Sequence, residues 1–283
     1  MPVSQLFRFA LPLGTTDVVG LMSQQFDRWL ILLSFPAVAF ADYQAGAWQI
    51  PVISTVAYSV GAAYMPVLVQ AFGRGAHAEA ISIWRDTICK VSLIVVPVTL
   101  GFVVAARELM TLLFTPAYVA AAPIFQLYAI LTLGRVATFG SVIVAAGRPR
   151  FVLQAALLSL VCNVVLSTLL TRTFGFIGPA LGTALAFFPM VAFYLWAIAR
   201  ASGVPVREVF PFSGYLRVLA LALISAGLAL LLKRWLMGPP GLMVCVSVFT
   251  TILGFAALGT ITGTIRREDW RYVVSWTRLK LAG

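Results

Sequence analysis

The sequence has few charged residues, one histidine and three cysteines, and these shortages exclude several classes of protein. Charged residues make up 10% of the chain and apolar residues 61%, with a mean hydropathy of +0.99, a composition outside the range of soluble domains. Cys89, Cys162 and Cys245 are far apart, and His77 has no cysteine or histidine near it in the sequence. Because C-x-x-C, Walker A, G-x-S-x-G and H-E-x-x-H patterns are also missing, we expect no disulfide framework, metal site or enzymatic active site.

The net charge of +11 would suggest a nucleic-acid partner in a soluble protein. Here most cations flank apolar stretches, where anionic lipid headgroups attract Lys and Arg. We therefore expect membrane lipids as partners and no nucleic acid.

Eight apolar stretches run through the chain, and the connections between them alternate in cation content. The stretches are Phe9–Phe35, Trp48–Phe72, Val91–Ala106, Phe125–Gly147, Phe151–Thr171, Gly178–Ala199, Leu216–Leu232 and Gly241–Thr262. Fourteen cations belong to one set of connections: Arg8, Arg74, Arg85, Lys90, Arg148, Arg150, Arg200, Arg207, Arg217, Arg266, Arg267, Arg271, Arg278 and Lys280. Only Arg107, Arg172, Lys233 and Arg234 belong to the other. The positive-inside rule then predicts eight spans with both termini in the cytoplasm.

The spans are predicted to be helices, which makes this an all-α integral membrane protein. Continuous apolar runs of about 20 residues fit transmembrane helices, whereas barrel strands show shorter alternating segments. The first stretch contains Asp17, Gln24, Gln25, Asp27 and Arg28. Because a signal-peptide core is short and apolar, we expect this stretch to remain in the protein.

The chain divides into a six-helix unit, residues 1–200, and a C-terminal part, residues 201–283. The C-terminal part begins with a basic linker containing Pro205 and Pro211 and continues with the last two spans, which we expect to lie at the periphery. Its tail, Thr264–Gly283, mixes aromatic and basic residues, which predicts a helix lying in the membrane interface.

Polar residues inside the first span are the first functional candidates. Asp17, Gln24 and Arg28 lie within about 20° of one line on a helix, and Asp27 points about a quarter-turn away. Ionisable groups in a membrane face a bundle interior or a wet cavity. Two interpretations stay open: these residues line a hydrophilic cavity, or they hold neighbouring helices together.

Arg135 is the second candidate, because it lies in the middle of an apolar stretch. Tyr128 and Thr132 share its helix face. Such a cation needs an anion, a carbonyl group or water. The sequence leaves open whether it pairs with Asp17, Asp27 or a helix end, or binds an anionic substrate.

Two further patterns favour helix packing. Ser159, Asn163 and Ser167 repeat at a spacing of four residues, which favours hydrogen bonds between helices. Gly178 and Gly182 form a G-x-x-x-G pattern, which predicts a close helix–helix seam.

Four groups of short motifs, in this order along residues 6–200, resemble one family. They are Leu11-Pro-Leu-Gly with Gln25-Phe-Asp-Arg28, Gly73-Arg-Gly with Ala80-Ile-Ser-Ile-Trp-Arg85, Leu112-Leu-Phe-Thr-Pro-Ala-Tyr118 with Ala122-Pro-Ile-Phe125, and Ala146-Gly-Arg-Pro-Arg150. The chain is similar to the second half of polysaccharide biosynthesis membrane proteins, which are the O-antigen, capsule and exopolysaccharide flippases of the multidrug/oligosaccharidyl-lipid/polysaccharide exporter superfamily.

The resemblance implies a fourteen-helix transporter of two six-helix lobes plus two helices, of which this chain is similar to helices seven to fourteen. It implies a bacterial inner-membrane protein that moves undecaprenyl-pyrophosphate-linked oligosaccharides through a cation-lined cavity. Arg28, Arg135, Gln24, Tyr128 and Asn163 are then expected to bind the substrate, because a pyrophosphate needs cations.

The resemblance also implies coupling to a proton or sodium gradient, without another cofactor, and Asp17 or Asp27 is expected to exchange the ion. We expect a partner that completes the transporter: a first lobe missing from this chain, or a second copy. A truncated, nonfunctional gene product is a further interpretation. Alternative functions are drug or metabolite export within the same superfamily, or a membrane-embedded polysaccharide polymerase or ligase.

Overall fold

A computed structural model of the protein describes residues 3–236 and 238–265, except for the side chains of residues 3–9, 52, 54, 57 and 58. The described chain is helical and contains no strand. The helices are α1 (Val3–Ser34), α2 (Ala37–Gly46), α3 (Pro51–Gly73), α4 (His77–Val104), α5 (Ala106–Leu113), η1 (Pro116–Ala121), α6 (Ala122–Arg135), α7 (Phe139–Ala145), α8 (Pro149–Phe174), η2 (Gly175–Ile177), α9 (Gly178–Ser202), α10 (Val206–Val209), α11 (Phe212–Trp235) and α12 (Pro240–Ile261).

Five segments of the described chain are long and apolar enough to cross a membrane: His77–Val104, Pro116–Ala145, Pro149–Ser202, Phe212–Trp235 and Pro240–Ile261. The third, with 54 residues, contains both α8 and α9. The two remaining predicted spans coincide with α1 and α3. The prediction of an all-α, multi-pass membrane protein is confirmed.

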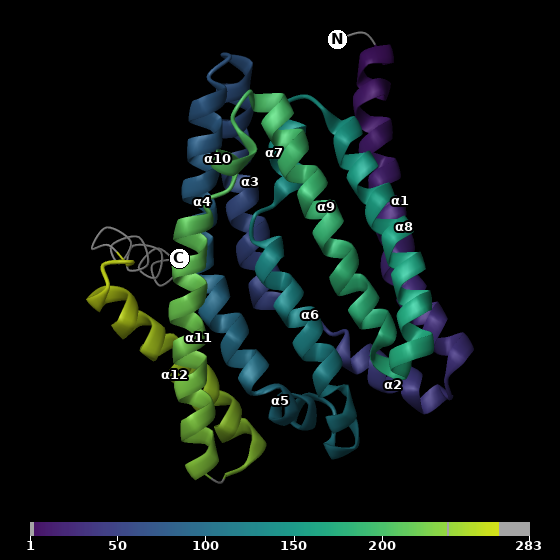
Figure 1. Ribbon diagram of the computed structural model, residues 1–283, viewed down its shortest axis with the longest axis vertical. Coiled ribbons are helices and arrows are strands. Elements are labelled where there is room, and N and C mark those ends of the chain that lie inside the picture. Colours follow the sequence, from purple (N-terminus) through teal and green to yellow (C-terminus); the bar gives the residue numbers. More distant parts are fainter. Residues whose placement is uncertain (1–2, 237, 266–283) are drawn as a thin grey trace, which may run out of the picture.

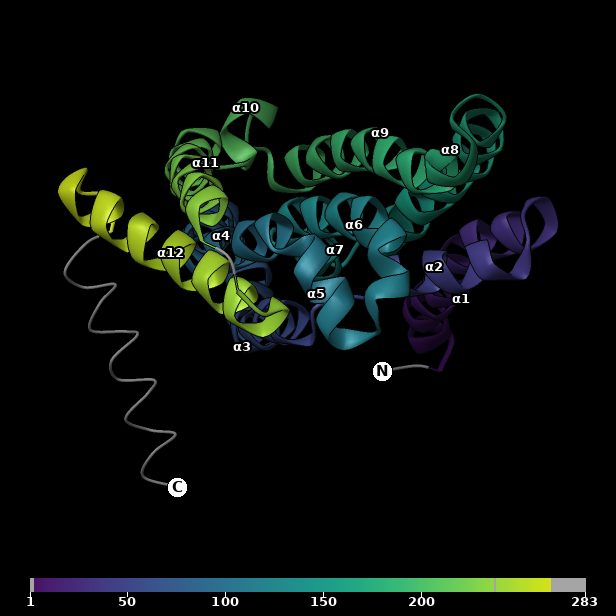
Figure 2. The ribbon, with the colours of Figure 1, turned by 90° about the horizontal axis from the view of Figure 1, so that it is seen from below.

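The helices form two groups with α6 and α7 between them. In one group α8 packs against both α9 and α1, and in the other α4 packs against α3, α11 and α12. The helix α6 contacts both α4 and α9. Figure 1 shows most of the long helices running roughly along the long axis of the molecule. In the end-on view of Figure 2, α1 and α2 lie at one side of the molecule and α11 and α12 at the other. This arrangement leaves α6 and α7 facing the α1–α8–α9 group.

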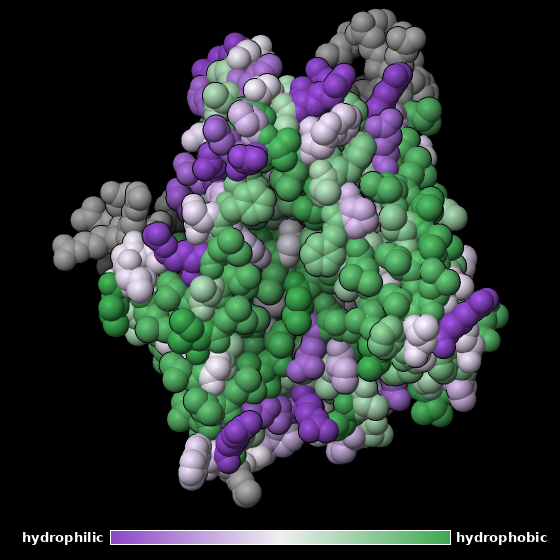
Figure 3. All heavy atoms as spheres, in the orientation of Figure 1, coloured by the Kyte–Doolittle hydropathy of each residue, from purple (hydrophilic) through white to green (hydrophobic). Residues whose placement is uncertain are grey.

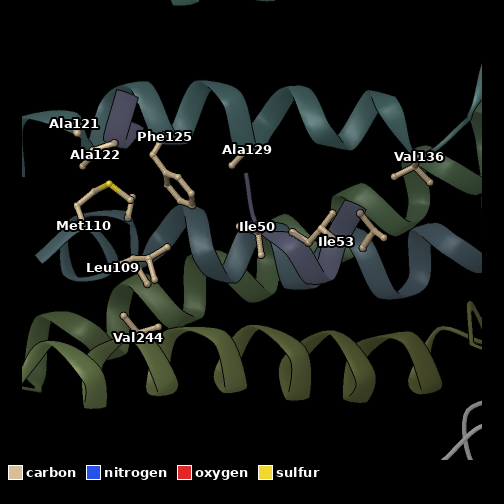
Figure 4. Close-up of a cluster of buried hydrophobic side chains, with 14 of the residues drawn as sticks. Ile50, Ile53, Leu109, Met110, Ala121, Ala122, Phe125, Ala129, Val136 and Val244 are labelled. Carbon is tan, nitrogen blue, oxygen red and sulfur yellow. The ribbon is translucent and has the colours of Figure 1, made fainter. Parts of the chain in front are cut away.

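Buried side chains form a core on the α4 side of α6. One cluster joins α3, α5, α6 and α12 through Ile53, Met110, Phe125 and Val244 (Figure 4). The Met110 side chain is fully buried. Burial of this apolar surface fixes one face of α6 and leaves its other face for the cavity described below.

The predicted span Phe125–Gly147 coincides with one of the five apolar segments, Pro116–Ala145, but its helix is interrupted. The helix α6 ends at Arg135, and α7 begins at Phe139. Between them Thr138 has a φ angle of +40°, in the left-handed region that non-glycine residues seldom adopt. Gly134, just before the break, lies so close to α9 that a Cβ atom there would overlap the ring of Phe187. Irregular backbone at membrane depth is tolerated where it is buried in protein or lines a cavity, and this break does both.

The last two spans, α11 and α12, pack directly on α4. Gly101 of α4 makes the closest approach, since a Cβ atom there would lie 2.9 Å from the Cα of Val248. At the end of α11, the Lys233 ammonium donates to the Glu108 carboxylate at 2.6 Å and to the Val104 carbonyl at 2.8 Å. These contacts fasten the two helices to the six-helix unit. The predicted interface helix of the tail lies mostly outside the described residues.

The connections alternate between the two ends of the molecule, as the cation pattern predicts. The α3–α4 turn, the α7–α8 turn and the start of the linker after α9 lie toward the upper end of Figure 1, while α2, α5 and the turn after α11 lie toward the lower end. Hydrophobic residues cover the broad middle of the face shown in Figure 3, and hydrophilic residues gather mainly toward its ends. Which end faces the cytoplasm stays a prediction.

Thiol labelling of two opposite turns tests the orientation. The single substitutions Ala78→Cys and Gly238→Cys, both at exposed positions, are made in a background whose three native cysteines are serine. Because the cation-rich side is expected to be cytoplasmic, an impermeant maleimide added to intact cells labels the Gly238→Cys variant and not the Ala78→Cys variant, while permeabilised cells show labelling of both. Labelling of both variants in intact cells contradicts the eight-span topology.

Candidate functional site

A cavity of about 210 Å³ lies among α1, α2, α6, α8 and α9. Six of the seven residues predicted from sequence line it, from three different helices: Gln24, Asp27, Arg28, Tyr128, Arg135 and Asn163. The seventh, Asp17, is exposed on α1 and is not among the lining residues. The cavity is thus a place in a membrane-spanning fold where cationic, anionic and neutral polar groups meet.

The carboxylate of Asp27 is the most enclosed charged group of this cavity, with only 2% of the residue exposed. It accepts hydrogen bonds from the hydroxyls of Tyr128 on α6 at 3.0 Å and of Ser167 on α8 at 3.2 Å. The hydroxyl of Thr183 on α9 also donates to it. All of these donors are neutral, and none of the ion pairs found in the described residues includes Asp27.

Asn163 extends this network and leaves one oxygen unused. Its amide nitrogen donates to the Thr183 hydroxyl at 2.6 Å. Asn163 is 1% exposed, and its side-chain oxygen has no hydrogen-bond partner. A buried polar atom without a partner is uncommon and calls for an explanation. Together with the Asp27 carboxylate and the nearby hydroxyls, it gives a set of oxygen donors of the kind that hard cations prefer.

A second tyrosine supports the network from α2. The Tyr43 hydroxyl lies 2.9 Å from the Tyr128 hydroxyl, and because Tyr128 donates its own hydrogen to Asp27, Tyr43 is the donor in this pair. Burial raises the pKa of the Tyr43 phenol above its ordinary value, so it keeps this hydrogen. Three hydroxyls on α6, α8 and α9 therefore donate to one carboxylate of α1, and a fourth hydroxyl, on α2, orients one of them.

The close packing of α8 and α9 brings two of those donors to Asp27. A Cβ atom on Gly182 would lie 2.5 Å from the Cα of Ser167, and one on Gly178 would meet the backbone of Leu170. The predicted G-x-x-x-G seam is confirmed. The Ser167 hydroxyl is also 3.2 Å from the carbonyl of Pro179, so its one hydrogen is shared between that carbonyl and Asp27. The contact with Pro179 fits the predicted role of the serine and asparagine stripe in interhelical hydrogen bonding.

The two cations of the cavity lie on different helices. Arg28 follows Asp27 on α1, and its guanidinium is 3.5 Å from the side-chain oxygen of Gln25. Arg135 is the last residue of α6, where the negative end of the helix dipole favours a cation. Its side chain is exposed, and no ion pair in the described residues involves it. This geometry favours the helix end over a carboxylate as the local partner of Arg135.

A neighbouring hollow of about 230 Å³ shares Arg135 with the main cavity and reaches the break after α6. Its other walls include Thr138, Ser141, Phe187 and Tyr194. The Tyr194 ring stacks on Phe139, with centroids 5.8 Å apart and planes at 6°. Arg135, Phe187 and Tyr194 line both spaces, so the two are adjacent.

Sequence reasoning missed two residues of the Asp27 network, Tyr43 and Thr183. Tyr43 lies in a short helix between spans, a segment that the hydropathy pattern passes over. Thr183 follows the Gly178–Gly182 seam directly, and this proximity is the signal that could have identified it. Asp17, which shares a face with Gln24, is exposed and does not line the cavity, although its neighbour Thr16 does. Its predicted ion-coupling role receives no support from this geometry.

The family model of the lipid II flippase MurJ matches residues 15–249, most of the chain. The chain belongs to the MurJ lipid II flippase family. This confirms the exporter superfamily that the motifs predicted, and the members of the matched family are flippases, which are transporters and not enzymes.

Two curated relatives of this MurJ-family chain are archaeal. An uncharacterized membrane protein of Methanocaldococcus jannaschii is 30% identical over 169 residues, which are 57% of this chain and 32% of the relative. A probable low-salt glycan biosynthesis flippase of Haloferax volcanii, Agl15, is 25% identical over 182 residues, 60% of this chain and 38% of the relative. The matched region is thus about a third of each relative's length. No solved structure matches significantly.

Replacing Gly182 with Ala tests the seam that positions Ser167 and Thr183. The added methyl group would meet backbone atoms of α8, so the variant is expected to lose about 1–3 kcal/mol of stability, as overpacked cores do. Gly227→Ala in α11 is the matched control, because nothing lies within 4 Å of its Cβ position, and a helical alanine is at least as stable as glycine there. Thermal unfolding of the purified protein in detergent measures both. Equal melting temperatures would contradict the close approach.

Proposed function

We propose that this chain forms one lobe of a transporter that flips a lipid-linked oligosaccharide across the membrane. The observation that carries the proposal is the cavity between helices of a MurJ-family chain, lined by Arg28 and Arg135. In finer detail, we propose an undecaprenyl-pyrophosphate carrier, bearing an O-antigen, capsule or exopolysaccharide unit, in a bacterial inner membrane with both chain termini in the cytoplasm.

The chemistry of the cavity supports an anionic headgroup. Guanidinium groups bind phosphate oxygens through paired N–H donors and keep their charge at all physiological pH values. Arg135 has no ion-pair partner among the described residues, so it is available to a ligand. Gln24 and Gln49, which also line the cavity, offer the neutral hydrogen bonds that sugar hydroxyl groups accept and donate.

We further propose that a second lobe completes the cavity. Transporters of this general kind alternate access by moving one bundle against another around a midplane site, and this chain supplies one such bundle. The opposing wall would come from a first lobe, on the same or another polypeptide, or from a second copy of this chain.

Ligand binding by the purified chain tests the role of the two arginines. Wild type is expected to bind a fluorescent polyprenyl-pyrophosphate-linked saccharide, and Arg28→Gln or Arg135→Gln to weaken binding about 10- to 100-fold. This range corresponds to the loss of one hydrogen bond to a charged group, about 1.5–3 kcal/mol. Arg74→Gln is the matched control, because Arg74 is exposed at a helix turn and pairs with Glu79.

The same measurement separates the alternatives. If Arg135→Gln binds normally, Arg135 is not part of the substrate site. If the wild type binds a lipophilic cation and ignores the pyrophosphate lipid, drug export replaces the proposed function. The folded yield of each variant in detergent is recorded alongside, so that a folding defect is not read as a binding defect.

We propose Asp27 as the group that couples transport to an ion gradient. A buried carboxylate with only neutral donors is costly as an anion, so it gains stability either by binding a proton or by holding a small cation. The unpaired side-chain oxygen of Asn163 and the hydroxyls of Ser167 and Thr183 lie around the Asp27 carboxylate. This set of oxygen atoms supports sodium as an alternative to a proton as the coupling ion.

Ion-dependent stability tests this coupling. If sodium binds the folded protein at Asp27, the melting temperature of wild type in NaCl should exceed that in KCl by mass action, and Asp27→Asn should abolish the difference. If a proton is exchanged instead, the two salts give equal values, and melting depends on pH in wild type but not in Asp27→Asn. Asp17→Asn, outside the cavity, is the control. A wild type that responds to neither ion nor pH contradicts the role of Asp27.

A further inference from the structure

The break between α6 and α7 frees backbone carbonyl groups that a continuous helix would satisfy. In such a helix the carbonyl of Ala137 would accept from the amide of Ser141, but that amide donates to the carbonyl of Thr138 at 3.0 Å. The carbonyl of Leu133 would likewise pair with the amide of Ala137. Unsatisfied carbonyl groups inside a membrane protein are costly, so the break depends on other donors.

Two aromatic side chains from neighbouring spans supply those donors. The indole nitrogen of Trp84, on α4, donates to the Ala137 carbonyl at 2.7 Å. The hydroxyl of Tyr215, on α11, donates to the Leu133 carbonyl at 2.8 Å. The two bonded carbonyls lie on either side of Arg135, two residues before it and two residues after it.

Both donors are held in place by ring contacts. Trp84 is 2% exposed and packs edge-on against Phe139, the first residue of α7, with centroids 5.8 Å apart. Tyr215 packs against Phe210 in the linker, with centroids 5.5 Å apart. Their donor atoms therefore have little freedom to leave the break.

We propose that Trp84 and Tyr215 are positioning residues that hold the break open and thereby keep Arg135 at the cavity wall. This rests on the proposed function, in which Arg135 binds the phosphate of the lipid substrate. Where α6 ends decides where Arg135 points, and the strained backbone of Thr138 persists only if its surroundings hold it. Through Tyr215, the helix α11 contributes to the substrate site without touching the substrate.

Tyr215→Phe is the decisive variant, because it removes the donor and keeps the ring. Binding of the fluorescent polyprenyl-pyrophosphate saccharide should weaken about two- to tenfold, the range expected for one neutral hydrogen bond. In an Arg135→Gln background the same change should have no further effect, because two residues that act through one contact are not additive. Tyr118→Phe is the control; Tyr118 lies in η1, in ring contact with Phe114.

A second readout needs no substrate. The substitution Ser141→Cys, at a position that lines the hollow beside the break, provides a thiol for a water-soluble maleimide in a background free of the native cysteines. Tyr215→Phe should change the labelling rate at least twofold, and Tyr118→Phe should leave it unchanged. A changed rate in a protein that does not bind the lipid supports the positioning role and refutes only the proposed substrate.

Two results would refute the positioning role of Tyr215. If Tyr215→Phe leaves labelling unchanged, or weakens binding equally with and without Arg135, the positioning role is refuted. If it lowers folded yield while the remaining folded protein binds and labels normally, Tyr215 serves stability alone, and the proposal is refuted as well.

Discussion

The buried carboxylate of Asp27 sets the strictest condition on this fold. An ionised group that is 2% exposed must be matched by hydrogen bonds or by a bound ion. The structure meets the first need with hydroxyls from α6, α8 and α9, so these three helices and α1 must converge on one point. The glycine seam that brings α9 against α8, and the Tyr43 contact from α2, serve the same convergence. The cavity lies beside the Asp27 carboxylate, between the helices that meet there.

Buried polar groups of the backbone between α6 and α7, at the other side of the cavity, also need hydrogen-bond partners. An interrupted helix inside a membrane needs replacement donors for its carbonyls, and α4 and α11 provide an indole and a phenol. The cation at the end of α6 also suits the negative end of the helix dipole. Three side chains thus stabilise the broken helix: Trp84 and Tyr215 donate to its carbonyls, and Arg135 interacts with the negative end of its dipole.

The all-α, multi-pass character of the chain could be predicted, because burial in lipid imposes long apolar runs and leaves cations in the connections. The site could be predicted in part. Polar residues in apolar stretches identify Gln24, Arg28 and Arg135 as cavity residues, but the sequence does not show which polar residues of α1 reach the cavity. Asp17 does not line it, although its neighbour Thr16 does. The break at Thr138 has no proline to mark it. It depends on donors from α4 and α11, which are distant in sequence and become neighbours only in the folded protein.

The helix α1 carries both an anion and a cation of the cavity in adjacent positions. Consecutive residues on a helix point about 100° apart, so Asp27 faces the hydroxyls of α8 and α9 while Arg28 faces another part of the cavity wall. Both groups belong to one rigid element. In the proposed coupling, a change in the charge of Asp27 would alter how strongly α1 is held against α8 and α9, and a shift of α1 would also move Arg28. The proposed coupling between an ion and a substrate would then need no chain of intermediate residues, because a single helix would carry both binding groups.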